Sequence, residues 1–390
     1  MAIYLDHNAG APARPEAIAA TLRMLAGAEG NPASVHRSGQ RARRALEDAR
    51  AQVAELIAAA PREIVFTSGG TEANNLAISG VLASARNRGR VITSAFEHSS
   101  ILAPLGESET RGFEIVRIAP DSDGRVSPAA VIAALDGATA LVTLGLVNAE
   151  VGSILDAAPI AEAAARAGAI FHLDAAQAAG RIAINVRETR CDLMTLSAHK
   201  LGGLAGMGAL FIRDGVTIAP QLLGGPQEAA MRAGTPNLIG AVAFGAAAEA
   251  ADAAMETERA RIETMAAAML AGLRSAIPGV RLNGPSDARV ANTVNLTFPG
   301  VLGESMLIAL DLEGVEVSMG SACAAGAVEP SHVLLAMGRS AAEARSSLRI
   351  SLGWNTTPAE IDSAVATIAR VWRRVSQAEP LGASAIGAAR

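Results

Sequence analysis

The feature that most constrains the fold is an alternation of short apolar runs with helical stretches over the first two-thirds of the chain. Apolar runs lie at 64–66, 90–93, 140–147, 169–173 and 192–196, and each ends at polar or small residues. This alternation predicts an α/β fold, in which helices cover a mainly parallel sheet of about seven strands. Because ligands of such sheets bind beyond the carboxyl ends of the strands, the polar residues that follow the runs are the first candidates for a site.

A long Ala-rich stretch from about Asn237 to Ser275 predicts a helix that joins two domains. We predict a large α/β domain over residues 14–256. We expect residues 1–13 and 257–390 to form a smaller α+β domain.

The last third of the chain predicts strands at 290–298 and 349–352, and then a final helix. That helix opens with Thr357 as its N-cap, Pro358 at the first position and Glu360 at the third, a pattern that favours a helix start.

Charge and cysteine spacing exclude several classes of protein. The formal net charge is −5 and no basic run could follow a phosphate backbone, so we predict no nucleic-acid partner. No strongly apolar stretch reaches about 18 residues and no leader pattern opens the chain, so we expect a cytoplasmic protein without membrane contact. Cys191 and Cys323 lie far apart without metal-ligand spacing, which argues against a metal cluster or a disulfide framework.

Lys200 is the only lysine in the chain, and all the other basic residues among the 33 are arginines. A preference for arginine codons explains the arginines but not the one position that remained lysine. Lysine, unlike arginine, can lose its proton and form a Schiff base. The sequence therefore favours a chemical role for Lys200.

Polar groups follow three of the predicted strands. A glycine turn at 68–72 follows the run 64–66, opens a helix and could bind an anion. Asp174 and Gln177 follow the run 169–173. Ser197 and His199 follow the run 192–196 and stand beside Lys200. Taken singly, the turn is also a common connector and Asp174 a common helix cap. Together they supply a phosphate cradle, an acid for a pyridinium nitrogen and an amine, which are the needs of pyridoxal 5'-phosphate.

At these residues the chain resembles the cysteine desulfurases of the NifS/IscS kind, within the class V, fold-type-I group of pyridoxal-phosphate enzymes. The resemblance runs nearly end to end. Its motifs are Tyr4-Leu5-Asp6, Gly30-Asn31-Pro32-Ala33-Ser34 with His36, Glu63 to Gly69 with Thr71-Glu72, Glu97-His98, Asp174-Ala175-Ala176-Gln177, Ser197-Ala198-His199-Lys200, Arg232-Ala233-Gly234-Thr235, Gly320-Ser321-Ala322-Cys323 with Glu329-Pro330-Ser331, and Ser347 to Gly353.

The resemblance implies a role for each matching residue around the cofactor. Lys200 would hold pyridoxal 5'-phosphate covalently, and Asp174 would pair with its ring nitrogen. Gln177 would face the ring oxygen, while His98 would stack on the ring and move protons. The groups that would hold the phosphate are Gly70, Thr71, Ser197 and His199, together with Thr235 of the partner subunit in a homodimer.

The resemblance also implies a reaction. Cys323 would take sulfur from L-cysteine as a persulfide, leave L-alanine, and pass the sulfur to an acceptor or scaffold protein, as in iron–sulfur cluster assembly. Small residues around Cys323 favour a movable segment, whereas Cys191 fits a buried structural thiol. Arg349 would clamp the substrate carboxylate in two-pronged fashion, and Asn31 would also contact substrate.

Three departures from the family pattern leave alternatives open. Ala149 stands where the family usually has the second Asn of Val-Asn-Asn-Glu, and the segments 9–11 and 203–206 have lost polar or rigid residues. The lost amide gives some weight to a selenocysteine lyase or another β-eliminating lyase of the same fold. A non-catalytic relative that acts as a scaffold is the second alternative, and retention of Lys200, Asp174, His98 and Cys323 argues against it.

Overall fold

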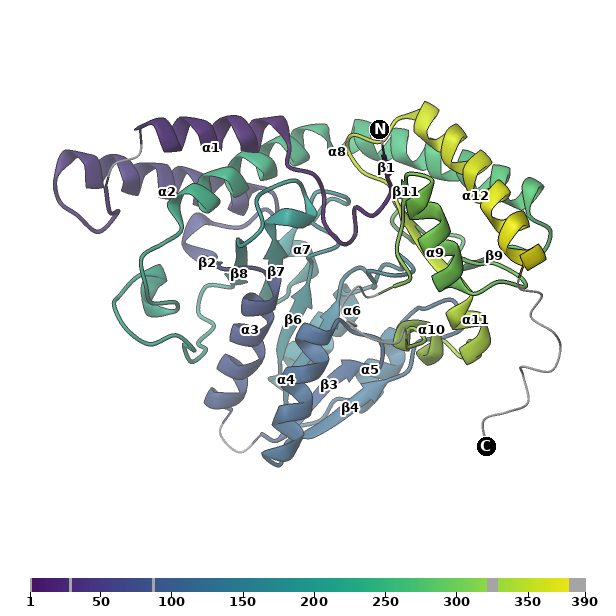
Figure 1. Cartoon of the computed structure of the whole chain (residues 1–390). Helices are drawn as coiled ribbons and strands as arrows, with labels where there is room; N and C mark the ends of the chain where they lie inside the picture. The colour runs from purple at the N-terminus through teal and green to yellow at the C-terminus, as the bar shows by residue number, and fades with distance from the viewer. Residues whose placement is uncertain (1, 28–29, 86–87, 321–328, 379–390) are drawn as a thin grey trace.

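The computed structural model describes residues 2–27, 30–85, 88–320 and 329–378, and a seven-stranded sheet lies at its centre (Figure 1). The strand order is β2-β8-β7-β6-β5-β3-β4. Only β8 runs antiparallel to its neighbours β2 and β7, so the prediction of a mainly parallel sheet is confirmed. The strands are β2 (Ile64–Thr67), β3 (Arg90–Ser94), β4 (Glu114–Ile118), β5 (Thr139–Gly145), β6 (Ile170–Asp174), β7 (Leu193–Ser197) and β8 (Gly208–Ile212).

Helices cover both faces of this sheet. Alternate side chains of each strand point to opposite faces, so Phe171 of β6 joins one apolar cluster while Leu141 of β5 joins the other. The first cluster includes residues of α2, α6 and α8, and the second those of α3 and α4. The helices that precede the domain junction are α1 (Pro15–Gly27), α2 (Arg37–Glu55), α3 (Gly70–Ser84), α4 (Ser99–Thr110), α5 (Pro128–Ala134), α6 (Ala158–Ala167) and α7 (Val186–Thr189), with short 3-10 turns η1 (Pro61–Glu63), η2 (Ala198–Lys200) and η3 (Glu228–Ala230).

The C-terminal third forms a second layer system around its own core, at the right of Figure 1. An antiparallel sheet of order β12-β10-β9 packs against helices, and the N-terminal strand β1 pairs in parallel with β11. The first residues of the chain therefore belong to this part of the fold. The elements are β1 (Ile3–Tyr4), β9 (Arg281–Asn283), β10 (Thr293–Thr297), α9 (Gly303–Leu312), β11 (Val315–Glu316), α10 (His332–Ala336), α11 (Ala341–Arg345), β12 (Ser347–Ser351) and α12 (Pro358–Ala378).

The long helix α8 (Leu238–Ala276) runs through both parts of the molecule. Its residues up to Ala251 are buried in the core of the large sheet, and those from Ile262 onward are buried in the second core. The predicted domain boundary between 256 and 257 falls in this change-over. By length and composition alone α8 could cross a membrane, but 44% of its most apolar window is buried inside the fold, as in a core helix.

Candidate active site

Two neighbouring strands bring the predicted cofactor residues together. β6 ends at Asp174 and β7 ends at Ser197, and the two strands run parallel with Asp174 opposite Thr195. The turn η2 follows β7 at once and carries His199 and Lys200. Because parallel strands end at one edge of the sheet, the acid and the lysine lie at the same edge.

Lys200 lies in a cation-rich, mostly buried environment. Its Nζ donates hydrogen bonds to the carbonyl oxygens of Asn8, at 2.6 Å, and Ala9, at 2.9 Å. Burial, reinforced by the positive charges of Arg181 and Arg349, lowers the pKa of Lys200 to about 8. A lysine with this pKa supplies a useful fraction of neutral amine near neutral pH, which is the form that attacks a carbonyl.

Asp174 and His98 are held by short-range hydrogen bonds. The Asp174 Oδ1 accepts from the backbone N–H of Ala176 at 2.9 Å, and its Oδ2 accepts from Asn74 Nδ2 at 2.7 Å. His98 is the N-cap of α4, where its Nδ1 accepts from the Ser100 N–H at 3.1 Å. Burial lowers the pKa of His98, so the imidazole is neutral at neutral pH.

The glycine turn between β2 and α3 is the candidate anion cradle. Gly208 of β8 packs so closely that an added Cβ would lie 2.6 Å from the backbone of Gly69, and a Cβ on Gly70 would lie 3.4 Å from that of Ser197. The Ser197 hydroxyl and His199 Nδ1 are 3.1 Å apart beside this turn. Burial lowers the pKa of His199 to about 4, so it meets an anion as a neutral hydrogen-bonding group.

The first residues of α3 complete the cradle. Gly70 opens the helix and Thr71 follows it with an exposed side chain, so free backbone N–H groups and the positive end of the helix dipole face the same space as Ser197. A phosphate group fits this donor set. The four phosphate-binding residues that the sequence predicts in one subunit are thus contributed by adjoining elements.

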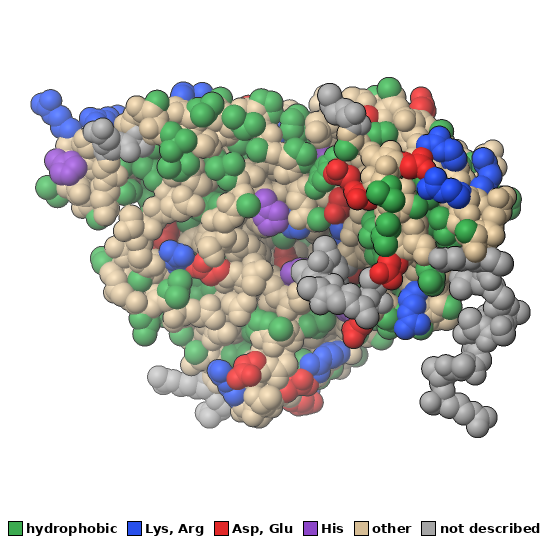
Figure 2. All heavy atoms as spheres, in the orientation of Figure 1, with side chains coloured by type: hydrophobic (Ala, Val, Ile, Leu, Met, Phe, Trp, Pro, Cys, Tyr) green, Lys and Arg blue, Asp and Glu red, His purple; other side chains and the backbone are tan. Residues whose placement is uncertain are grey.

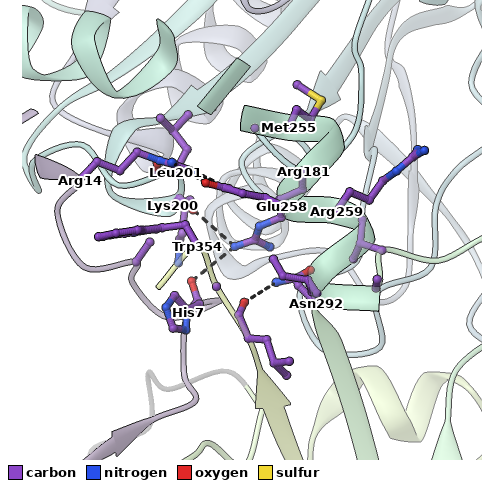
Figure 3. A pocket seen from close by; sticks show the side chains of 17 residues that line it. His7, Arg14, Arg181, Lys200, Leu201, Met255, Glu258, Arg259, Asn292 and Trp354 are labelled. Carbon is purple, nitrogen blue, oxygen red and sulfur yellow. Dashed lines mark hydrogen bonds and ion pairs between the residues drawn. The ribbon is translucent and has the colours of Figure 1, made fainter. Parts of the chain in front are cut away.

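Gln177 is oriented by a neighbouring arginine. Its Nε2 donates to the Asn8 carbonyl at 3.0 Å, and its Oε1 accepts from Arg181. Arg181 also donates to the carbonyl oxygens of His7 and Lys200. It lines a cavity of about 50 Å³ (Figure 3). Because Arg181 can only donate, it fixes the Gln177 amide with the oxygen toward the guanidinium.

The second domain contributes Arg349 from β12. This side chain is 4% exposed and its Nη2 donates to Asp6 Oδ1 at 2.8 Å. Its Nη1 reaches the carbonyl oxygen of Ala149 at 3.4 Å, and the same oxygen accepts from Asn8 Nδ2 at 2.9 Å. The position that lacks the family amide is therefore beside the predicted carboxylate clamp.

Other predicted residues are not part of this group in the single chain. Asn31 lies exposed between α1 and α2, where its Oδ1 accepts from the Ala33 N–H, and none of its described hydrogen bonds joins it to Lys200, Asp174 or Arg349. Thr235 lies exposed between η3 and α8. Cys323 lies outside the described residues.

The remaining cysteine, Cys191, is fully buried. Burial raises the pKa of its thiol to about 12, so almost none of it is thiolate at neutral pH. This environment matches the structural role predicted for Cys191.

Comparison with known proteins shows the family of this chain. The family model for class-V aminotransferases matches residues 3–363. The chain belongs to the class-V aminotransferase family. Within it, the chain is 40% identical to cysteine desulfurase 2 of Trichormus variabilis over 97% of this chain and 95% of the relative. It is 41% identical to a cysteine desulfurase of Cereibacter sphaeroides over 98% of this chain and 99% of the relative. The predicted resemblance is confirmed.

Solved structures of similar proteins show the same fold. A NifS-like protein superposes with a TM-score of 0.90 at 29% identity, covering 96% of this chain and all of that one. A structure of SspA in complex with cysteine superposes with a TM-score of 0.80 at 32% identity, covering 90% of this chain and 98% of that one.

Four site residues escaped the sequence analysis: Asn8, Asn74, Ser100 and Arg181. Asn74 lies one helical turn after Gly70 and Arg181 lies four residues after Gln177, which are the only signals that could have drawn attention to them. Asn8 acts through its backbone oxygen as much as its side chain, and no residue pattern reports that.

Proposed function

We propose that this chain is a cysteine desulfurase that uses pyridoxal 5'-phosphate to convert L-cysteine into L-alanine and a persulfide on Cys323. The observation that carries the proposal is the placement of the only lysine, with a pKa of about 8, in the turn η2 directly after β7, the strand that pairs with the Asp174 strand β6, and beside the glycine turn. Relatives at about 40% identity over nearly the whole chain bear the same activity in their names.

The donor set of the site fits the cofactor. Gly70, Thr71, Ser197 and His199 would hold its phosphate, Asp174 its ring nitrogen, Gln177 its ring oxygen and Lys200 its aldehyde carbon. Gly208 of β8 admits no side chain beside this turn, because a Cβ there would lie 2.6 Å from the backbone of Gly69. When bound, the cofactor supplies an electron sink that stabilises negative charge at the substrate carbon.

The protein's own groups would handle charge and protons around the substrate. Arg349 is buried and its Nη2 donates to Asp6, so its guanidinium would be oriented to receive the substrate carboxylate beside Asp6. His98 is kept neutral by burial, and as a neutral imidazole it would stack on the cofactor ring and donate a hydrogen bond from Nε2. Lys200, once released by substrate, carries an amine whose pKa suits proton transfer in the same pH range.

The sulfur step exchanges one bond for another. The Cys323 thiolate attacks the substrate sulfur, so the carbon–sulfur bond of the substrate breaks and a sulfur–sulfur bond forms on Cys323. The electron pair of the broken bond stays with the substrate carbon, which takes up a proton to become the methyl group of alanine. No external oxidant is needed, because the two electrons that the transferred sulfur loses are kept by the substrate carbon.

We further propose that the enzyme acts as a homodimer in which Thr235 reaches the phosphate of the partner subunit. Thr235 is exposed in its own chain, and its loop is held in place by an ion pair between Arg232 and Glu72 at 2.9 Å. Hydrophobic side chains are gathered over α1 (Figure 2), where Leu22 and Leu25 are 61% and 64% exposed. Light scattering coupled to gel filtration should give twice the mass of one chain, and Leu22→Glu should lower it.

The decisive experiment follows the sulfur atom. The purified protein is incubated with L-cysteine, and alanine and bound persulfide are measured in the wild type, Cys323→Ser and Cys191→Ser. Loss of both products in Cys323→Ser alone supports the proposal. Persulfide on Cys191 with alanine near the wild-type level would contradict the choice of thiol.

A second substrate separates the rival activities. If selenocysteine is converted much faster than cysteine, and Cys323→Ser still converts it, the chain is a lyase. If neither substrate reacts and the protein binds no cofactor, the scaffold alternative holds. A sulfur-acceptor or scaffold protein as partner and a cytoplasmic location stay predictions.

A further inference from the structure

One buried amide links the two residues that face the cofactor ring. Asn74 is 1% exposed on α3, and its Nδ2 donates to Asp174 Oδ2 at 2.7 Å and to Ser100 Oγ at 2.7 Å. Ser100 Oγ in turn lies 2.7 Å from Nδ1 of His98. An unbroken path of hydrogen bonds therefore runs from the acid through Asn74 and Ser100 to the imidazole.

The direction of each hydrogen bond on this path is determined. Ionised Asp174 can only accept, so the amide must turn its NH2 group toward it. That orientation leaves Asn74 Oδ1 buried without a partner among the described atoms, and a flipped amide would place the oxygen against the carboxylate. The second amide hydrogen then points at Ser100 Oγ. The Ser100 hydroxyl must therefore donate its own hydrogen to a different acceptor.

The hydrogen bonds at the end of this path determine which ring nitrogen of His98 carries the hydrogen. Ser100 Oγ accepts from Asn74, so its hydrogen is free to point at His98 Nδ1, which also accepts from the Ser100 backbone N–H. With two donors aimed at Nδ1, the neutral ring carries its hydrogen on Nε2. Protonation of Nδ1 would break both bonds, so the same arrangement opposes a charged His98.

We propose that Asn74 is the positioning residue that couples Asp174 to His98. One amide hydrogen is donated to Asp174, which we call the Asp174 branch, and the other to Ser100, which contacts His98 and which we call the Ser100 branch. The Asp174 branch holds the carboxylate in one orientation for the ring nitrogen. The Ser100 branch keeps His98 neutral, with Nε2 as its hydrogen-bearing atom. The cofactor part of this inference rests on the proposed function, whereas the state of His98 can be read in the apoprotein.

Other charged groups also face His98. They are Asp174 at the end of β6, Lys200 in η2 and His332 at the start of α10. Of these, Asp174 accepts a hydrogen bond from Asn74. Ser100→Ala leaves that bond in place, so a change in His98 in this variant reports on the hydrogen-bond path to His98 alone.

The test compares Asn74→Ala with Ser100→Ala and with Asn75→Ala as a matched control. Asn75 is the next asparagine of α3, and its Nδ2 donates to the Thr71 carbonyl at 2.9 Å on the helix surface. The ring nitrogens of His98 are followed by NMR of histidine-labelled apoprotein over pH, and the His98 signals are assigned by their loss in His98→Gln.

We expect the His98 pKa to rise by about one unit in Asn74→Ala and in Ser100→Ala, the shift that one ordinary hydrogen bond produces. Cofactor dissociation, measured by fluorescence, should rise about tenfold in Asn74→Ala alone, since only that variant removes a donor from the Asp174 carboxylate. Asn75→Ala should change neither quantity.

A His98 pKa in Asn74→Ala equal to that of the wild type, or a wild-type ring hydrogen on Nδ1, would overturn the proposal. Should Asn74→Ala fail to fold, Asn74→Ser gives the same test, because a single hydroxyl can serve only one branch. A protein that shows the His98 shifts but no desulfurase activity would retain this inference and reject the proposed function.

Discussion

The site has two halves that differ in how they control charge. One is the sheet half, at the strand ends, and the other is the interface half, at the domain interface. In the first, one carboxylate is surrounded by neutral amide, hydroxyl and imidazole groups that each have a fixed hydrogen-bond direction. In the second, the charges of Arg181 and Arg349 act on Lys200, and the Asp6 carboxylate pairs with Arg349 at 2.8 Å. The sheet half is Asn74, Ser100, His98 and Asp174, and the interface half is Asp6, Arg181, Lys200 and Arg349.

The difference teaches that one site uses two means of tuning. In the sheet half, hydrogen bonds hold groups in one protonation state and one orientation, and these bonds act over a short range. In the interface half, like charges and burial lower the pKa of Lys200, and this effect needs no direct contact. Substitutions should therefore have local effects in the first half and effects at a distance in the second.

The largest effect should come from Lys200 itself. Lys200→Ala removes the only amine side chain of the protein, so covalently bound cofactor absorbance and alanine formation should both be lost. Lys200→Arg keeps a cation but cannot supply a neutral amine, and should be equally inactive. Turnover of cysteine by either variant would show that the interface half does not contain the attachment point.

The second prediction separates the two roles of the Arg349–Asp6 pair. Arg349→Gln should raise the KM for cysteine about a hundredfold, because a buried cation that pairs with the substrate is lost. Asp6→Asn also breaks the pair but keeps the guanidinium. Both variants should lower the free energy of unfolding by about 3 kcal/mol in urea titrations, whereas only Arg349→Gln should raise KM strongly. Equal changes in KM would mean that Arg349 serves the domain interface alone.

The sequence predicted the residues that follow strands better than the residues that hold them in place, for a physical reason. Asp174, Ser197 and Lys200 follow apolar runs directly, so a periodic pattern and the rule for strand ends suffice to bring them together. Arg181 and Asn8 act through backbone carbonyls and through a domain contact between positions more than 160 residues apart. Such contacts leave no local pattern.

Strands show the same division between local and distant information. The boundaries of β6, β7 and α8 agree with the predicted runs to within a residue or two. β4 was not predicted, because Glu114 and Arg117 interrupt its apolar residues at the edge of the sheet, where charged side chains reach solvent. β8 was also missed, since it follows a glycine-rich turn and depends on pairing with β2 and β7.

The third prediction restores the amide that the family usually carries. Ala149→Asn places a hydrogen-bonding group next to Arg349, whose Nη1 already reaches the Ala149 carbonyl at 3.4 Å. One hydrogen bond to a charged group should lower the KM for cysteine about tenfold. Ala149→Leu is the control for size and should not lower it. An unchanged KM in Ala149→Asn would indicate a pocket rebuilt by neighbouring residues and would strengthen the lyase alternative.

The last prediction concerns action at a distance within the interface half. Lys200 has a folded-state pKa of about 8, below the ordinary value for lysine of about 10.4, so the unfolded apoprotein binds more protons between these pH values. The free energy of unfolding of the apoprotein should therefore rise with pH across this window. The rate of covalent cofactor attachment should rise with pH as well, with its midpoint near pH 8, because attachment needs the neutral amine.

Arg181→Gln should move both effects toward higher pH, because burial is the main cause of the lowered Lys200 pKa and the charge of Arg181 is the next. The expected shift of the attachment midpoint is about half a unit, the size of a screened interaction between like charges. Arg181→Lys keeps the charge and should leave the midpoint in place. Arg259 lines the same cavity but is exposed, so Arg259→Gln is the matched control (Figure 3). A midpoint that moves equally in Arg181→Gln and Arg181→Lys would assign the effect to the hydrogen bond with Gln177, and the interface half would then be tuned in the same way as the sheet half.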